Sequence, residues 1–199
     1  MLYYMFNKPP QCVTACSDVL HRTVMDYFPP ALAARLHPVG RLDKDTCGLL
    51  LLTDDGSLDG KLMQPDRHVR KTYFFYALGQ MDQEKQKRLE GGIPLAGFTA
   101  RTAQFRLGKI YPVRALAEHI PPDRRERYLK NPDGPAFSGT LTIHEGKKHQ
   151  VKRMLRAVGC KIFYLRRDRI GGLALDPGLA PGAFRQLTPE ELALLTAET

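Results

Sequence analysis

Four consecutive leucines at residues 49–52 place the strongest constraint on how this chain of 199 residues folds. A short, fully apolar run bounded by turn residues is typical of a strand that is buried on both faces. The turn residues follow directly, as Asp-Asp-Gly at positions 54–56. The whole stretch reads GRLDKDTCGLLLLTDDG from Gly40 to Gly56, so charged residues stand immediately before a segment that must be buried.

The two acids before the leucines, Asp43 and Asp45, fit known carboxylate motifs poorly. A calcium-binding loop requires a third ligand where Cys47 stands and a glutamate where Asp54 stands. A phosphatase that forms an aspartyl-phosphate requires a Thr or Val one place beyond Thr46. Neither motif explains the stretch, and a half-buried carboxylate is costly unless it is paired.

The residues alone leave two interpretations of Asp43 open. It is either a turn or capping carboxylate paired with Arg41 or Lys44, or an ionised aspartate that acts as a nucleophile or base. Lys152 is the natural cation for the second interpretation, because it lies on the polar flank of an expected helix. The alternative for Lys152 is a solvated lysine that binds phosphate.

Thirty Lys and Arg against 21 Asp and Glu give a net charge of +9 and a pI near 9.5. Basic residues cluster in two segments, at residues 147–156 and 166–169. A clustered excess of this kind indicates a polyanionic partner, and nucleic acid is the one we expect.

Metal and cofactor sites are not expected. Cys12, Cys16, Cys47 and Cys160 lack the paired spacing of a zinc site and indicate the reduced thiols of a cytoplasmic protein. The sequence has no glycine-rich nucleotide loop, no signal peptide and no apolar run of membrane-spanning length.

Local patterns predict an α+β fold without strict alternation of strands and helices. Helices are expected at 57–63 with Ser57 as the N-cap, at 82–90, at 147–158 and from Thr188 onwards. Residues 18–36 have a mixed pattern broken by two prolines, and residues 118–134 are expected to be a charged loop or insert. Strands are predicted at residues 2–9, 48–53, 69–79, 98–105, 111–116, 137–144 and 160–165.

Strand alternation in RKTYFFY places Lys71, Tyr73 and Phe75 on one face and aromatic neighbours on the other. One face belongs to the core. The other exposes rings beside basic residues, an arrangement that suits stacking on a nucleobase. Core packing is the alternative for Tyr73 itself.

Taken in order, these segments resemble the RsuA-type family of bacterial ribosomal RNA pseudouridine synthases. The resemblance rests on YYMFNKP, GRLDKDTCGLLLLTDDG, KTY, EGKKHQVKRMLRAVG and LRRDRIGGLALDPGLAPGAFRQLT. It implies the pseudouridine synthase fold, a bent and mostly antiparallel sheet in two lobes with a central active cleft. It also implies the isomerisation of a uridine in ribosomal RNA to pseudouridine, without a cofactor.

Residue roles follow from the same resemblance. Asp43 would be the catalytic aspartate, Tyr73 would stack on the flipped uracil, and Lys152 would keep Asp43 charged. Arg41 would help to fill the gap left when the uridine leaves its stack. Contacts with RNA are also implied for Lys147, Lys148, Gln150 and Arg153.

The resemblance also predicts the domain organisation and the binding partner. Residues 1–199 are expected to be one catalytic domain of two lobes, a monomer without the small N-terminal RNA-binding domain of many relatives. Its substrate is expected to be small-subunit ribosomal RNA or an assembling ribosomal particle. Substrate choice would then rest on the catalytic domain, on residues 118–134 or on a helper. A non-catalytic RNA-binding protein built on the same scaffold is the competing hypothesis.

Overall fold

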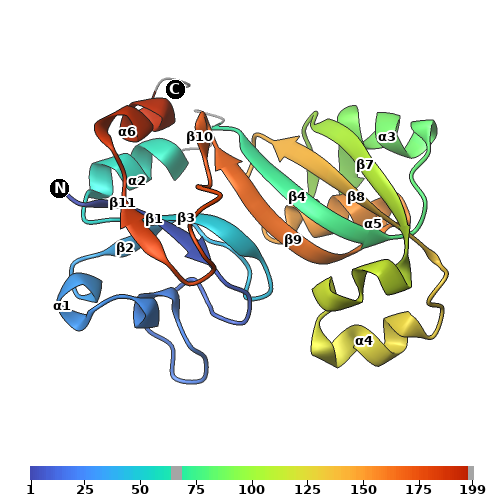
Figure 1. The fold of residues 1–199 in the computed structure, drawn as a ribbon. Helices are drawn as coiled ribbons and strands as arrows, with labels where there is room; N and C mark the ends of the chain where they lie inside the picture. Colours follow the sequence, from blue (N-terminus) through green and yellow to red (C-terminus); the bar gives the residue numbers. More distant parts are fainter. Residues whose placement is uncertain (64–68, 197–199) are drawn as a thin grey trace. The chain divides into compact units, whose positions relative to one another are not determined.

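The computed structural model describes residues 1–63 and 69–196, and the chain divides into two compact units (Figure 1). The first unit contains Met1–Lys71 and Arg166–Thr199, and the second contains Thr72–Leu165. The second unit is therefore an insertion within the sequence of the first.

The first unit is built around β3 (Cys47–Thr53), whose seven residues are all buried. β1 (Tyr3–Lys8) runs antiparallel to β3, and its other edge pairs with β11 (Phe184–Gln186). β2 (His37–Val39) and the end of β9 (Lys161–Ile170) pair with β3, and β10 (Leu173–Ala174) pairs with β9. The predicted strands at 2–9 and 48–53 are confirmed.

Both faces of β3 are covered, which explains the uninterrupted leucines. Leu49 and Leu51 pack into a cluster that also contains Met5. Leu50 is paired with Phe6, whose ring lies 5.5 Å from that of Phe28. A strand that packs against side chains on both faces has no solvent-facing position, and so no polar alternation.

β3 and β9 approach each other very closely at Gly48. A Cβ atom added there would lie 2.4 Å from the Arg167 carbonyl oxygen, and the glycine φ is +97°. Only glycine accommodates both the contact and the left-handed backbone.

Helices of the first unit match the predicted places, with one correction. α2 (Gly56–Met63) is capped by Asp55, whose Oδ1 accepts the Ser57 amide at 2.9 Å, so the predicted Ser57 N-cap is wrong. The reason is that the helix begins one residue earlier than the serine. α6 (Pro189–Thr196) begins after Thr188, which forms a reciprocal capping pair with Glu191. The mixed 18–36 segment holds two short pieces, η1 (Val24–Tyr27) and α1 (Pro30–Ala33).

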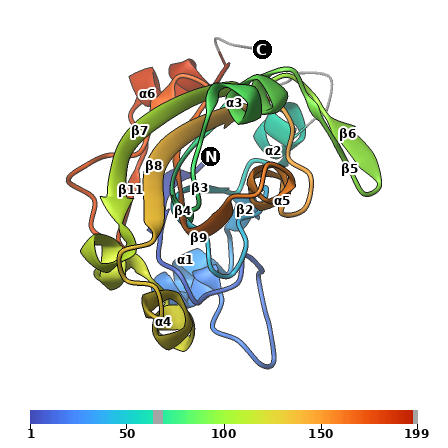
Figure 2. The ribbon, with the colours of Figure 1, turned by 90° about the vertical axis from the view of Figure 1, so that its right-hand side faces the viewer.

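The second unit has strands in the order β9-β4-β8-β7. β4 (Lys71–Leu78) starts at the boundary between the units, and β7 (Gln104–Pro112) and β8 (Pro135–Ile143) form a long antiparallel pair (Figure 2). The helix predicted at 82–90 is confirmed as α3 (Gln83–Glu90), and Asp82 caps it. A hairpin of β5 (Ile93–Leu95) and β6 (Phe98–Ala100) contacts α5 (Gln150–Ala157).

Three predictions for the second unit are wrong. The single strand expected at 98–105 is divided between β6, which ends at Ala100, and β7, which begins at Gln104. The strand expected at 111–116 ends at Pro112, and the 3₁₀ segment η3 (Val113–His119) follows it. The expected charged loop at 118–134 contains α4 (Pro122–Leu129), with proline in its first turn. The helix carries mostly charged side chains and buries only Tyr128, so its sequence shows no apolar stripe.

Candidate active site

Residues 40–46, between β2 and β3, form the loop that carries the predicted catalytic aspartate. Gly40 opens the loop with a φ of 67°. Asp43 is half-buried, and Arg41 is exposed. The Thr46 amide donates to the Asp43 carbonyl at 3.0 Å, so the backbone turns immediately after the aspartate.

A buried lysine holds this loop from the side of β1. Lys8 Nζ lies within hydrogen-bond distance of the carbonyl oxygens of Asp43 (3.2 Å), Lys44 (3.4 Å), Thr46 (2.8 Å) and Pro9 (3.1 Å). The side chain is 0% exposed, and burial lowers its pKa. Backbone carbonyls therefore replace water around this ammonium group and fix the loop on which Asp43 stands.

No motif of the sequence points to Lys8. Its only local signal is a lysine that closes an otherwise apolar strand just before Pro9. The bonds that give it a role span 35 to 38 residues of sequence, so no local pattern contains them.

Residues 11–14 support the same loop from the start of the next segment. Thr14 Oγ1 donates to the Leu42 carbonyl at 2.8 Å and accepts from the Leu42 amide at 3.2 Å. The Gln11 amide donates to the Lys44 carbonyl at 2.7 Å. The loop at 40–46 is thus bonded to two segments that come earlier in the chain.

Two further buried cations lie in the first unit, and no sequence motif points to either of them. Lys71 is 8% exposed and Arg167 is 3% exposed. Lys71 Nζ donates to the Val69 carbonyl at 3.1 Å, and Arg167 Nε donates to the Leu49 carbonyl at 2.9 Å. Burial and the neighbouring Arg167 lower the pKa of Lys71 to about 8. Among the described residues, Arg167 Nη2 has no hydrogen-bond partner.

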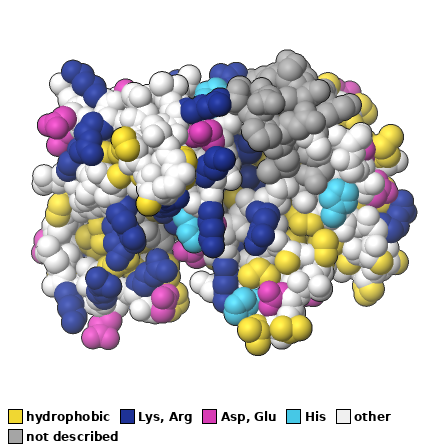
Figure 3. Space-filling model, turned by 180° about the vertical axis from the view of Figure 1, so that it is seen from behind, with side chains coloured by type: hydrophobic (Ala, Val, Ile, Leu, Met, Phe, Trp, Pro, Cys, Tyr) yellow, Lys and Arg dark blue, Asp and Glu magenta, His cyan; other side chains and the backbone are white. Residues whose placement is uncertain are grey.

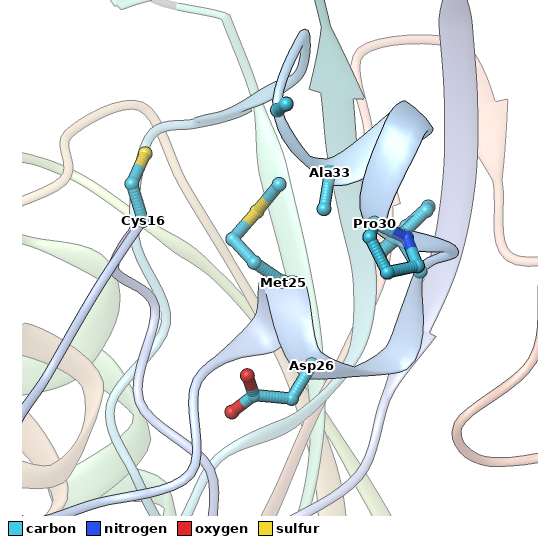
Figure 4. A pocket seen from close by; sticks show the side chains of 7 residues that line it. Cys16, Met25, Asp26, Pro30 and Ala33 are labelled. Atoms are coloured by element: carbon cyan, nitrogen blue, oxygen red, sulfur yellow. The ribbon is translucent and has the colours of Figure 1, made fainter.

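An open hollow of about 610 Å³ also lies in the first unit. Figure 4 shows the Met25 side chain between Cys16 and the helix that carries Pro30 and Ala33. The carboxylate in its lining, Asp26, accepts the Thr23 amide at 2.7 Å and caps η1. Because the Asp26 carboxylate caps η1, the described lining of the hollow provides no acid–base pair for catalysis.

In the second unit, β4 places Tyr73 on the more buried of its two faces. Burial alternates along the strand, and Tyr73 is 8% exposed while Phe75 is 0% exposed. The opposite face, with Thr72 and Phe74, is half-buried rather than open to solvent. The predicted alternation is confirmed, but the prediction that the other face exposes its rings is wrong, because Phe74 and Tyr76 are half-buried. Tyr73 itself lies on the core face of the strand.

The loop before α5 is held by a buried glutamine. Gln150 is 3% exposed, its Nε2 donates to Glu145 at 2.6 Å, and its Oε1 accepts the Lys147 amide at 3.1 Å. His149 adopts a left-handed backbone, with φ of 55°, and α5 begins directly after it. This network presents Lys147 and Lys148 as exposed side chains at the start of the helix.

Along α5, Lys152 and Arg153 are half-buried on the polar side of the predicted apolar stripe. The Arg153 guanidinium lies 4.9 Å from the centre of the Phe98 ring and donates to the Ala96 carbonyl. Arg153 therefore connects α5 to the β5–β6 hairpin in addition to any contact it makes with RNA. The predicted helix at 147–158 is confirmed as Gln150–Ala157, and Gly159 follows it with a φ of +78°.

The surface charge agrees with the composition. Lys and Arg side chains are abundant on the face shown in Figure 3. Within residues 1–63 and 69–196, no group of three His, Cys, Asp or Glu side chains is placed to hold a metal ion. A search of the same residues finds no helix long and apolar enough to cross a membrane.

Comparison with known proteins decides the family. The family model for RNA pseudouridylate synthases matches residues 2–157. The chain belongs to the RNA pseudouridine synthases. Its segments and its relatives place it in the RsuA-type family, and the protein is an RNA pseudouridine synthase, an isomerase.

Two curated relatives show how far the similarity of this synthase extends. The uncharacterized RNA pseudouridine synthase YtzG of Bacillus subtilis (strain 168) is 40% identical over 98% of this chain and 73% of its own length. The ribosomal small subunit pseudouridine synthase A of Escherichia coli (strain K12) is 36% identical over 96% of this chain and 72% of its own length.

Solved structures agree with the fold of this synthase. A crystal structure of a pseudouridylate synthase superimposes with a TM-score of 0.79 at 34% identity, covering 98% of this chain and 73% of that one. The archaeal box H/ACA Nop10–Cbf5 complex gives a TM-score of 0.58 at 15% identity, a likeness of fold alone. The expected pseudouridine synthase fold is confirmed.

Proposed function

We propose that this enzyme converts a uridine of small-subunit ribosomal RNA to pseudouridine, with Asp43 as the catalytic carboxylate. The support for the substrate is the similarity, over nearly the whole chain, to relatives named ribosomal small subunit pseudouridine synthase A. The support for Asp43 is its place in the family motif and the loop around it, which Lys8 fixes through three loop carbonyls.

The reaction breaks the bond between C1′ and N1 of uridine and forms a bond between C1′ and C5. The proton on C5 leaves and a proton is added at N1, so atoms balance without a co-reactant. An ionised Asp43 serves this reaction either by attack on the ribose or by removal of a ribose proton. Both roles require a carboxylate held in one position, which the bonded loop provides.

The remaining assignments follow the family motifs. Tyr73 stacks on the flipped uracil, and Lys152 is the cation that keeps Asp43 ionised. Arg41, Lys147, Lys148 and Arg153 contact RNA, and Gln150 contributes by holding the loop that presents the two lysines. Affinity that comes from such phosphate contacts falls steeply as salt rises. The proposed partner is ribosomal RNA, either free or within an assembling particle, and the proposed state is a monomer in the cytoplasm.

Asp43→Asn tests the catalytic assignment. The substrate is small-subunit ribosomal RNA carrying 5-tritiated uridine, taken from a strain without this protein, and the measurement is tritium release. We expect no release above background from the variant, because the amide cannot act as a nucleophile or base. Asp45→Asn is the matched control and should release tritium at close to the parental rate.

Parental activity in Asp43→Asn would remove Asp43 from the mechanism. RNA binding by the unaltered protein without any tritium release would instead favour the non-catalytic RNA-binding hypothesis. Pseudouridine mapping in both ribosomal RNAs of the deletion strain identifies the position, and a missing pseudouridine in the large-subunit RNA would overturn the choice of subunit.

A further inference from the structure

The loop between β1 and η1 exposes two adjacent apolar side chains. Val19 is 99% exposed and Leu20 is 82% exposed. The other large hydrophobic side chains exposed within the described residues stand singly in sequence or on a β-strand edge. Single exposed apolar residues are ordinary on protein surfaces, whereas two adjacent ones at the tip of a loop make a candidate contact for a binding partner.

This loop has a fixed shape. At its base, the Val13 amide donates to the Arg22 carbonyl at 2.9 Å, and the Arg22 guanidinium lies 4.1 Å from the centre of the Tyr27 ring. At its tip, Asp18 Oδ1 accepts the amides of Leu20 and His21, each at 2.8 Å. The backbone at the tip is therefore bonded within the loop before any partner binds, which lowers the entropic cost of binding.

The loop lies beside the loop that carries Asp43, within the same unit. Thr14, at the start of the exposed loop, makes both hydrogen bonds to the Leu42 backbone described above. At the tip, the backbone amides of Leu20 and His21 lower the pKa of Asp18, and the charge of Lys44 adds to the effect. Lys44 directly follows Asp43, so the apolar tip and the proposed catalytic carboxylate belong to neighbouring loops.

The charge around the tip identifies the chemistry of its partner. His21, Arg22, Arg41 and Lys44 are all exposed and lie on these two loops. Basic side chains bind the phosphates of RNA, and exposed Val and Leu side chains can pack against the bases. Proteins that open nucleic-acid stacks combine these two features, with an apolar side chain inserted between base steps.

We propose that Leu20, supported by Val19, is a wedge that enters the base stack of the RNA beside the target uridine and holds the stack open once that uridine has turned outwards. This inference rests on the proposed function. Leu20 touches neighbouring bases rather than the reacting atoms, so it positions the substrate. Its contribution depends on the stack being closed at the start, because unstacking costs a few kcal/mol per step.

The test compares Leu20→Ser on two RNA substrates. One is a stem in which the uridine is paired and stacked, and the other is the same strand left single, with abasic sites on both sides of the uridine. We expect kcat/KM to fall about 10-fold to 30-fold on the stem, and less than about 3-fold on the opened strand. Leu20→Met should restore most of the activity on the stem. Ile110→Ser, an equally conspicuous exposed position at 74% in the second unit, is the matched control and should change neither value.

A second readout does not require turnover. The fluorescence of a 2-aminopurine placed beside the uridine should rise several-fold when Asp43→Asn binds the stem, and the double variant Asp43→Asn with Leu20→Ser should bind without that rise. Three results would each overturn the wedge. They are an equal loss of kcat/KM on both substrates, no loss of kcat/KM on the stem, and an unchanged fluorescence rise in the double variant. Failure of the proposed function is distinct, because the unaltered enzyme would then convert neither substrate.

Discussion

Two loops carry the charged side chains assigned to this reaction, and they are held in different ways. A buried cation, Lys8, holds the loop at 40–46 through the carbonyls of three loop residues. A buried neutral amide, Gln150, holds the loop before α5 through one carboxylate and one backbone amide.

The difference matches what each loop has to do. A carboxylate that reacts must be placed to within a fraction of an ångström. A cation bonded to three backbone carbonyls of a loop restricts that backbone more than a side-chain amide that accepts from one backbone amide. Lysines that contact phosphate tolerate more freedom, because their contribution is mostly long-range attraction. Three substitutions test this comparison.

Lys8→Met should have the largest effect. It leaves three loop carbonyls buried without their donor, and the loss of stability should be about 3–5 kcal/mol. Urea unfolding measures the stability, and tritium release at a temperature where the variant is folded should show kcat lowered by at least about 100-fold. Lys44→Met, at an exposed neighbour, is the control and should leave stability within about 0.5 kcal/mol. Normal kcat in a folded Lys8→Met protein would show that the cation does not position Asp43.

Lys71→Met tests whether burial alone accounts for the effect of Lys8. Lys71 is also a buried lysine, but it has one carbonyl acceptor among the described residues, that of Val69. Its pKa is about 8 when folded and near 10.5 when unfolded. Between these values the unfolded chain binds more protons, so this lysine makes stability rise with pH across that window.

At pH 7 both states of Lys71 are protonated and the buried cation is unfavourable, so Lys71→Met should be more stable than the parent by about 2 kcal/mol. That advantage should shrink as the pH rises from 8 to 10, and unfolding curves of both proteins at four pH values measure it. A constant difference across this range would mean that Lys71 does not titrate there.

Gln150→Leu should have the smallest effect. The substitution keeps the apolar volume but removes the bonds to Glu145 and to the Lys147 amide, at a cost of about 1 kcal/mol in stability. RNA affinity should fall about 2-fold to 5-fold while kcat at saturating RNA stays within about 2-fold, because the loop carries lysines proposed to contact phosphate rather than the reacting atoms. A fall in kcat as large as that of Lys8→Met would remove the contrast between the two loops.

Strong local patterns made the main elements predictable. β3 followed from its leucines and its turn, and α5 followed from an apolar stripe that ends at Gly159. α4 could not be found in this way, since charged side chains cover it and only Tyr128 is buried. β9 extends five residues past the predicted end, as Lys161–Ile170. Residues 166–169 are all charged, so the burial of Arg167 within them cannot be seen as an apolar pattern in the sequence.

Only those residues of the candidate site that belong to a family motif were predictable from the sequence. The family motifs identify Asp43, Tyr73 and Lys152 as candidates, but they contain no reason for Lys8 to matter. Its role depends on carbonyl oxygens that point towards it, and backbone direction is a property of the folded loop. For the same reason, the sequence could not separate Gln150, which is buried, from its exposed neighbours Lys147 and Lys148.

The pairing of β1 with β11 has a consequence for synthesis on the ribosome. β3 ends at Thr53, but β11 begins only at Phe184, after the whole second unit. At typical rates of translation, one edge of β1 waits on the order of ten seconds for its partner strand. During that time, the unpaired amides and carbonyls of β1 are available to any other nascent chain, since an open strand edge is a template for aggregation. The nascent protein is therefore most vulnerable late in its own translation, and chaperone capture of ribosome-bound chains should decline once β11 emerges.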